Sequence, residues 1–510
     1  MTPRDNAPEA LGPEPTAMPA RMTAAELRAA FFRTFPAVAP AIILGAIDQT
    51  ITATALPAIA GALDAVESIS WVVVGYLIAA TIAAPVYGRL GDVFGRRRLL
   101  LAALGIHALG AVTAATAAGF GWLILGRLLQ GAGGGGLTTL TMALIGEALP
   151  PRERGRFQAW IAGCFVIASS LGPVAGGWLT EGFGWRAVFF VQLPVAALAF
   201  LLGLRVPSRP GSRHAGFRFD FGGVVLFAGF VAPALLALSQ AQRLSFSALP
   251  AALGLAVVAV IALALLLRQE RRARDPLLPL GLLAEPTILR SNLFTGCAHG
   301  AVVGLVSFLP IYLQSVRGAS PGEAGMLLLP LSLGSGIGGL AAGRLMTAKG
   351  IAAPLAGSGL ALGAAGLVGV ALLGPLVSDA GLALLFGLAS MGMGCSYPVS
   401  QITVQVAAGP ARLGAAAASV QFARTLGAAT GTAFLGALLF GTLAAGDPMV
   451  AELFARLVRG GARLLPDLAA AEREALRAGL SEAFRFAFLG AALLAGMGCF
   501  FAWRVPVRRV

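Results

Sequence analysis

Charged residues are scarce in this sequence. Asp, Glu, Lys and Arg make up 12% of its 510 residues, whereas 57% of the residues are hydrophobic. The mean hydropathy is +0.83. So few polar side chains cannot cover the surface of a soluble protein of this size. The composition therefore excludes an ordinary soluble domain and indicates a chain that lies in a lipid bilayer.

Lysine is nearly absent, because Lys349 is the single lysine among 37 basic residues. The formal net charge is nevertheless +14, carried by arginines that fall in small groups between apolar runs. This spacing is typical of membrane topology, whereas a nucleic-acid site would need one basic patch. We therefore expect the lipid bilayer as a partner and no nucleic acid.

Cysteines and catalytic signatures are also rare. The four cysteines lie inside apolar runs, where they pack as small hydrophobic residues and no disulfide is expected. No metal-spacing cluster or nucleophile arrangement occurs, and the glycine run at 131–136 lacks the Lys-Ser/Thr of a phosphate-binding loop. We expect no enzyme activity, no metal and no cofactor. A membrane enzyme acting on lipid would need one of these sets of residues.

Long apolar runs, by contrast, are abundant. A helix needs about 20 apolar residues to cross a bilayer, and fourteen segments meet that requirement. They begin near Pro36, Trp71, Leu99, Gly121, Phe157, Trp185, Asp220, Ser247, Arg290, Pro321, Ala352, Ala380, Gly414 and Phe484. The pair within 220–267 is the least clearly separated, because only a short and mildly polar break divides it.

The placement of basic residues tests this count, because cytoplasmic loops carry the excess of arginine and lysine. With the N-terminus inside, the inside segments hold 26 basic residues and the six short outside loops hold three. Both termini are therefore predicted to be cytoplasmic. Omitting the pair after Asp220 would give twelve spans and keep every other loop on its side, so both counts stay open.

The two least apolar parts of the chain are its start and a late segment. Residues 1–35 have no apolar core after a basic start and are expected to form a cytoplasmic leader, not a cleaved signal peptide. Within it, an interfacial helix over 22–35 and a disordered tail both stay open. Residues 441–485 predict one or two amphipathic helices over the outer mouth, and leave a periplasmic adaptor protein open as a partner.

An internal repeat divides the chain. GRLGDVFG at 88–95 and GRLMTAKG at 343–350 match at an offset of 255, the offset that also relates Gly172 and Gly176 to Gly427 and Gly431. Many secondary transporters consist of two such halves around a site near the bilayer midplane. The chain is expected to divide into a leader at 1–35, a six-helix half at 36–205, two inserted helices with linkers at 206–286, and a six-helix half at 287–510.

Asp48 is the one acid deep within a predicted span. A carboxylate at the bilayer centre costs about 2.5 to 3.5 kcal/mol on insertion scales, so it needs a function or a partner. Arg127 differs from Asp48 in depth by only about 5 to 6 Å. We predict that the two residues form a proton-coupling pair, in which Asp48 alternates between an ionised and a protonated state. A static structural ion pair is the alternative.

Other spans contain glycines and polar residues that suggest packing or a cavity. Gly172, Pro173, Gly176 and Gly177 remove side chains from one helix face and predict close packing with a break in the helix. A buried Arg424 needs a counter-charge, carbonyls or an aqueous cavity. The substrate cavity is predicted to contain Gln130, Gln421 and Arg424. His107 and His299 are retained as alternative proton carriers.

These segments together resemble the major facilitator superfamily. GRLGDVFGRRR at 88–98 is similar to its loop signature between spans 2 and 3, LGRLLQGAGGG at 125–135 to its span 4 signature, and SSLGPVAGG at 169–177 to its antiporter signature. IDQTITATALPAI at 47–59 and WRAVFFVQLP at 185–194 resemble the fourteen-span drug:proton antiporter family, except that Gln192 stands where asparagine is usual.

The resemblance implies a cytoplasmic latch between the two halves. Asp92 can accept hydrogen bonds from a helix end or an arginine. The latch residues are expected to be Gly88, Asp92, Gly95 and Arg96. Thr347 replaces the aspartate in the second copy, so a charged latch would be one-sided. Arg97 and Arg98 are explained equally well by the excess of positive charge in cytoplasmic loops.

The same resemblance implies a fold and an activity. We expect an all-α major facilitator fold in a bacterial inner membrane, and a proton-driven antiporter that exports drugs or other amphipathic small molecules. Export of a specific metabolite, lipid or siderophore, or proton symport, remains the alternative. A sensor or non-transporting scaffold is less well supported, because it would tolerate loss of Asp48 and Arg127, which are both present.

Overall fold

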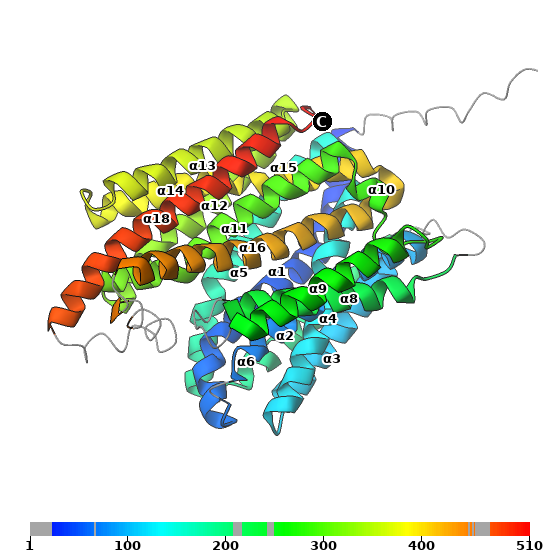
Figure 1. The fold of residues 1–510 in the computed structure, drawn as a ribbon. Coiled ribbons are helices and arrows are strands. Elements are labelled where there is room, and N and C mark those ends of the chain that lie inside the picture. The colour runs from blue at the N-terminus through cyan, green and yellow to red at the C-terminus, as the bar shows by residue number, and fades with distance from the viewer. Residues whose placement is uncertain are drawn as a thin grey trace, which may run out of the picture.

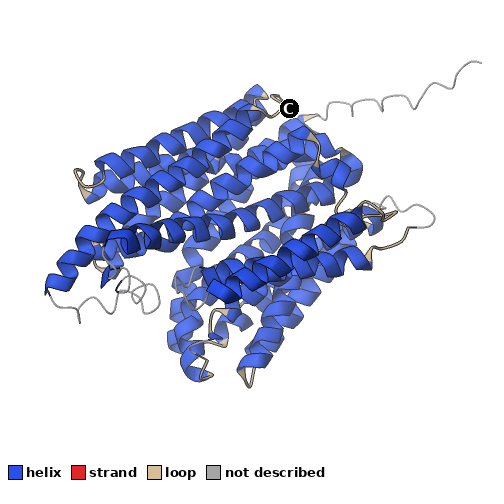
Figure 2. Cartoon of the chain, in the orientation of Figure 1, coloured by secondary structure: helices blue, strands red, loops and turns tan. Residues whose placement is uncertain are grey.

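The computed structural model describes residues 23–65, 68–207, 217–241, 249–446, 449–450, 453 and 470–509, and within these it is helical with one isolated β-bridge. The principal helices are α1 (Ala24–Ala62), α2 (Trp71–Phe94), α3 (Arg96–Ala115), α4 (Phe120–Ala148), α5 (Pro151–Phe183), α6 (Ala187–Phe190), α7 (Gln192–Gly203), α8 (Phe221–Ala241), α9 (Leu249–Glu270), α10 (Leu280–Leu283), α11 (Pro286–Ser315), α12 (Pro321–Lys349), α13 (Ala353–Leu373), α14 (Asp379–Gly394), α15 (Ser396–Ala408), α16 (Leu413–Gly446) and α18 (Ala470–Trp503). Figure 2 shows the helices joined by short loops.

Each of the fourteen predicted segments coincides with helical structure. The sixth is divided between α6 and α7, and the twelfth between α14 and α15. Among the described residues, 11 helical segments are long and apolar enough to cross a membrane, and a shorter apolar helix covers 187–203. The chain is thus a polytopic membrane protein, while the count of fourteen crossings stays a prediction.

Parts of the predicted leader and outer segment lie outside the described residues, namely 1–22, 447–448, 451–452 and 454–469. Within the described part, α1 begins at Ala24 behind a capping box formed by Thr23 and Glu26. Residues 24–35 therefore belong to the same helix as the first predicted span. α18 likewise begins at Ala470 and continues as one helix to Trp503.

The helices pack in two groups. Helices α1 to α7 contact one another, as do α11 to α18. Helices α8 and α9 pair with each other, and α8 also contacts α2 and α16. The two groups meet where α2 packs against α16 and α5 against α12. They converge at the end of the molecule that includes α10 and diverge toward the opposite end (Figure 1).

Glycines bring equivalent helices together in each group. Gly172 and Gly176 of α5 face α1, and a Cβ added at Gly176 would lie 2.7 Å from the carbonyl oxygen of Ile51. Gly427 and Gly431 of α16 face the backbone of α11 in the same way. The glycines related by the repeat offset therefore perform the same packing task, α5 on α1 and α16 on α11.

The other two residues of the span 5 motif do not take part in this contact. Pro173 is exposed, and α5 runs as one helix from Pro151 to Phe183, so the predicted break at Pro173 is not found. A Cβ at Gly177 would have no atom within 4 Å. Membrane-spanning helices tolerate an internal proline because neighbouring groups and small local adjustments satisfy the backbone groups that it frees.

This difference between two adjacent glycines is testable. Gly176→Ala should lower stability by about 1–3 kcal/mol, because the added methyl group overpacks the α1–α5 contact. Gly177→Ala should leave stability unchanged or raise it slightly, because alanine favours the helix and the site is open. Thermal denaturation of both variants in detergent, followed by size-exclusion chromatography, measures the difference. Equal melting temperatures would contradict the packing role of Gly176.

Candidate functional site

A buried ion pair joins α1 and α4. Arg127 donates from Nη1 to both carboxylate oxygens of Asp48, at 2.9 Å and 3.0 Å. The Asp48 side chain is 0% exposed and that of Arg127 is 1% exposed. Charges removed from water to this degree are stable only when they are paired and hydrogen-bonded. The structure therefore brings together the two residues that the sequence proposed as a pair.

Two glutamine amides complete the shell of the Asp48 carboxylate. Gln192 of α7 donates to Oδ1 at 2.8 Å and Gln130 of α4 donates to the same oxygen at 3.3 Å. Gln130 also accepts a hydrogen bond from Arg127 at 2.8 Å. The structure thus places Gln130, predicted for the substrate cavity, in this polar network, where it is fully buried.

The remaining faces of the Arg127 guanidinium are also occupied. Its Nε donates to the carbonyl oxygen of Val72 at 3.0 Å. The ring centroid of Tyr76 lies 4.6 Å from Cζ and that of Phe189 lies 5.9 Å away. Aromatic faces stabilise a cation that has lost its water. The ion pair is therefore enclosed by α1, α2, α4, α6 and α7.

His107 of α3 extends this network by one residue. Its Nδ1 lies 3.1 Å from the carbonyl oxygen of Gln130, and its Nε2 lies 3.1 Å from Oε1 of Gln192. Sequence reasoning retained His107 only as an alternative proton carrier and did not assign Gln192 to a site. The one sequence signal for Gln192 is its departure from the asparagine that is usual at this position.

A second carboxylate, Asp92, joins the two helix groups. Asp92 lies near the end of α2 and accepts hydrogen bonds from the backbone amides of Gly414, at 2.9 Å, and Ala415, at 3.1 Å, in the first turn of α16. A carboxylate at a helix N-terminus satisfies free amides and stabilises the helix dipole. Arg96 donates to Asp92 at 2.8 Å and to Glu147 of α4 at 2.7 Å.

The glycines of this loop provide the geometry for the contact. A Cβ at Gly88 would lie 2.6 Å from the carbonyl oxygen of Gly414, so α2 and α16 touch through their backbones. Gly95 has φ 98°, a conformation that favours glycine, and it separates α2 from α3. Gly88, Asp92, Gly95 and Arg96 are thus assembled at one interface between the helix groups.

The degenerate copy of the loop makes a contact of a different kind. Gly343 of α12 faces α5, and a Cβ at Gly155 would lie 2.5 Å from its carbonyl oxygen. Thr347 donates to the carbonyl oxygen of Gly343 within its own helix, at 3.1 Å. The α5–α12 interface therefore repeats the backbone approach of α2 and α16 without the carboxylate.

The other arginines of the loop have separate positions. Arg89 forms an ion pair with Asp275 at 2.9 Å, which ties α2 to the linker that follows α9. Arg97 donates to the carbonyl oxygen of Leu204 at the end of α7. Arg98 is exposed.

The second helix group contains its own buried cation, Arg424 of α16. The guanidinium approaches His299 and Gln421 at 3.3 Å each, and its Cζ lies 4.2 Å from the ring centroid of Tyr397 and 5.8 Å from that of Phe165. Among the described residues, no Asp or Glu forms an ion pair with Arg424. Arg424 therefore differs from Arg127, whose charge is neutralised.

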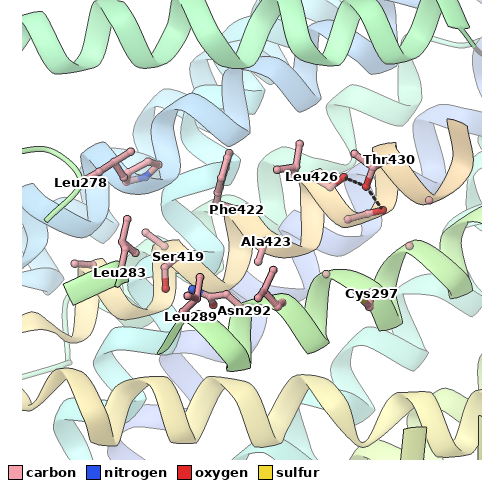
Figure 3. Close-up of a pocket in the computed structure, with 18 of the residues that line it drawn as sticks. Leu278, Leu283, Leu289, Asn292, Cys297, Ser419, Phe422, Ala423, Leu426 and Thr430 are labelled. Carbon is pink, nitrogen blue, oxygen red and sulfur yellow. Dashed lines mark hydrogen bonds between the residues drawn. The ribbon is translucent and has the colours of Figure 1, made fainter. Parts of the chain in front are cut away.

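A large cavity lies apart from both arginines. It has a volume of about 510 Å³ and an apolar lining drawn mainly from α11 and α16, including Leu289, Phe422 and Leu426 (Figure 3). Neither Asp48 nor Arg424 lines it. In this conformation the open volume and the buried charges are thus separate features.

Comparison with known proteins places these features in a family context. The family described as "Major Facilitator Superfamily" matches residues 38–432. "Multidrug transporter protein MdtP" of Bacillus subtilis (strain 168) is 29% identical over 400 residues, which cover 78% of this chain and 73% of MdtP. "Efflux pump dotC" of Dothistroma septosporum (strain NZE10) is 33% identical over 329 residues, which cover 61% of this chain and 54% of dotC.

A solved structure supports the fold. The crystal structure of the human organic anion transporter MFSD10 superimposes with a TM-score of 0.62 at 16% sequence identity, covering 92% of this chain and 99% of that one. At this identity the likeness concerns the fold alone. The all-helical arrangement and these matches show a transporter fold of the expected class and no enzyme family.

The ion pair leads to a prediction about stability. Arg127→Leu should destabilise the protein by about 3–5 kcal/mol, because it leaves the Asp48 carboxylate buried without a counter-charge. Adding Asp48→Asn should restore part of that loss, because the second variant removes the uncompensated charge. Thermal denaturation in detergent measures both effects, with the exposed Arg98→Leu as control. Equal losses in the single and double variants would contradict the pairing.

The latch leads to a prediction about local opening. Asp92→Ala should accelerate hydrogen–deuterium exchange of the amides at 413–416 by about 2- to 30-fold, because loss of a capping group costs about 0.5–2 kcal/mol. Asp92→Asn retains one acceptor and should have a smaller effect. Mass spectrometry of the matching peptide reports the change. Unchanged exchange in Asp92→Ala would show that these amides do not depend on the carboxylate.

Proposed function

This chain belongs to the Major Facilitator Superfamily, and on that premise we propose that it is a proton-coupled antiporter that exports drugs or other amphipathic small molecules by alternating access. The observation that supports proton coupling most strongly is the fully buried Asp48, held by Arg127 and two amides. Ionisation of an intramembrane carboxylate is costly unless a partner compensates it. Its protonation state is therefore sensitive to any change in that partner.

The proposed cycle follows from the enclosure of the pair. In the present conformation Asp48 is 0% exposed, so neither substrate nor water reaches it. Exchange of substrate for a proton therefore requires a conformation in which α1 and α4 face an aqueous cavity. We propose that Asp48 is ionised when it is held by Arg127 or by a cationic substrate, and protonated after substrate release.

The proposed topology places the Asp92 end of the molecule in the cytoplasm, with both termini on that side of a bacterial inner membrane. The convergence of the helix groups at this end then corresponds to a state closed to the cytoplasm. We assign the chain to the fourteen-span drug:proton antiporter family, with halves at 36–205 and 287–510 and an inserted pair at 206–286. The packing of α8 against one helix of each group, with α9 paired to it, supports this division.

The substrate class is proposed from the environment of Arg424. A cation without a carboxylate partner, lying against two aromatic rings, offers a polar and an apolar contact side by side. Such a surface suits amphipathic molecules of varied shape. Two of the similar proteins, a multidrug transporter and an efflux pump, agree with this proposal.

Transport in inside-out vesicles tests proton coupling. With an imposed pH gradient, the wild type should accumulate members of a panel of cationic, neutral and anionic amphipathic dyes and release protons as each dye enters. Asp48→Asn should reduce both signals at least about tenfold, because a carboxamide cannot exchange a proton.

The matched control is Asp64→Asn. Asp64 is an exposed acid just beyond α1 with φ 47°, a conformation that asparagine also tolerates, so this variant should transport normally. Undiminished coupling in Asp48→Asn would show instead that Asp48 and Arg127 form a static pair. Dye and protons moving in the same direction would identify a symporter.

A further inference from the structure

We propose that the apolar cavity beside α11 and α16 binds an anionic phospholipid, whose acyl chain lies in the cavity and whose phosphate contacts exposed arginines at one end of it. The proposal goes beyond the proposed function and does not rest on it, because a lipid can bind at this place whether or not the protein exchanges substrate for protons. The site is also distinct from the proposed substrate site, because Arg424 does not line the cavity.

The cavity lies on the opposite face of α16 from Arg424. Arg424 is two positions from both Phe422 and Leu426, which places it about 160° away from them around the helix axis. Its guanidinium faces Phe165 of the other helix group. The lining residues of α16 recur every three or four positions and so share one face, as in the series Ala415, Ser419, Phe422, Leu426 and Thr430 (Figure 3). The cavity therefore faces away from Phe165 and the other helix group.

The side chains at the edge of the cavity show that it opens to the bilayer. Leu289 and Leu293 of α11 line it and are 46% and 39% exposed, and Phe434 of α16 is 37% exposed. In a chain that spans a membrane, exposed apolar side chains outside the interface between the helix groups contact lipid. A lipid chain can therefore enter the cavity from the side.

The length and polarity of the cavity fit an acyl chain. Its wall on α16 runs from Ala415 to Phe434, about 28 Å, whereas one leaflet of the hydrocarbon core is about 15 Å thick. The Ser419 and Thr430 hydroxyls donate to carbonyl oxygens of their own helix. The cavity thus offers few polar contacts along its length, whereas a drug site usually contains several placed polar groups.

The end of the cavity near the Asp92 latch is polar and basic. Leu277 and Leu278 of the linker after α9 line this end. Arg274 precedes Leu277 by three residues, and Arg412 precedes the lining residue Ala415 by three residues. Both arginines are exposed, and the same linker region carries three more exposed arginines, at 268, 271 and 272.

The acids near this end are already engaged. Asp275 forms an ion pair with Arg89, and the Glu285 carboxylate caps the start of α11. Among the described residues, neither Arg274 nor Arg412 forms an ion pair. Asn292 lines the cavity near the same end, and its carboxamide oxygen has no hydrogen-bond partner among the described residues. Charged and polar groups are thus available where the headgroup would lie.

The arginines provide the selectivity of the site. Any lipid chain can occupy an apolar cavity, so the chain alone does not distinguish one lipid from another. A guanidinium binds phosphate oxygens through two parallel hydrogen bonds, and a cluster of arginines attracts a lipid with net negative charge. A zwitterionic lipid gains less, because its own cation opposes this attraction. We therefore expect the site to prefer phosphatidylglycerol over phosphatidylcholine.

Native mass spectrometry of the full chain in detergent tests the headgroup site without any transport assay. With equal amounts of phosphatidylglycerol and phosphatidylcholine of the same chain length, the wild type should retain mainly phosphatidylglycerol. Arg274→Gln and Arg412→Gln should each weaken this retention about fivefold and leave phosphatidylcholine unchanged. The control is Arg98→Gln, which removes an exposed arginine outside the site. Equal retention of the two lipids by the wild type, or unchanged retention in both variants, would overturn the proposal.

A second pair of variants tests the chain site. Leu426→Trp adds bulk to the cavity wall and should lower the retention of both lipids, whereas Leu109→Trp, on the exposed face of α3, should retain them as the wild type does. Thermal denaturation shows whether both variants are folded. Equal lipid retention in the two tryptophan variants would contradict the chain site. An amphipathic dye that displaces the lipid from the wild type and does not bind Leu426→Trp would assign the cavity to substrate instead.

Discussion

The cost of holding a carboxylate in a bilayer is the constraint on which the N-terminal helix group depends. Asp48 can be ionised there only because Arg127, Gln130 and Gln192 reach it from two other helices. The helices α1, α4 and α7 are thus tied together at one point, which lies near the middle of α1, in the first half of α4 and at the start of α7. Loss of any one partner leaves a charge or a polar atom unsatisfied, so the cluster behaves as a unit.

The two carboxylates, Asp48 and Asp92, differ in how easily their contacts can open. Asp48 is enclosed in the protein, whereas Asp92 lies at the end of α2, where water can replace the amides of α16 if the helices separate. The glycine contacts also fall into two kinds, those within a helix group and those between the two groups. Those of α5 on α1 hold one group together, whereas Gly88 and Gly343 lie where the groups meet. A transporter whose two halves move against each other as rigid bodies needs strong contacts within each half, and contacts between the halves that can break and re-form.

Much of this arrangement could be predicted from the sequence. The depth of Asp48 and Arg127 follows from counting residues along each helix, because the rise per residue is constant. Gln130, one turn from Arg127, could have been placed in the same cluster by that argument. The predicted break at Pro173 was wrong, because α5 continues as one helix through this exposed residue.

The sequence by itself determined that the chain is a membrane protein, the order and depth of its helices, and the internal repeat. It also determined which charged residues need a partner, because burying an unpaired charge costs too much free energy. Only the tertiary structure decided that His107 contacts Gln192, that Gln130 contacts Asp48, and that Arg424 lies beside His299 and Tyr397. The physical reason is that helical periodicity sets a residue's height, whereas its neighbours depend on how each helix is rotated and which helix packs beside it.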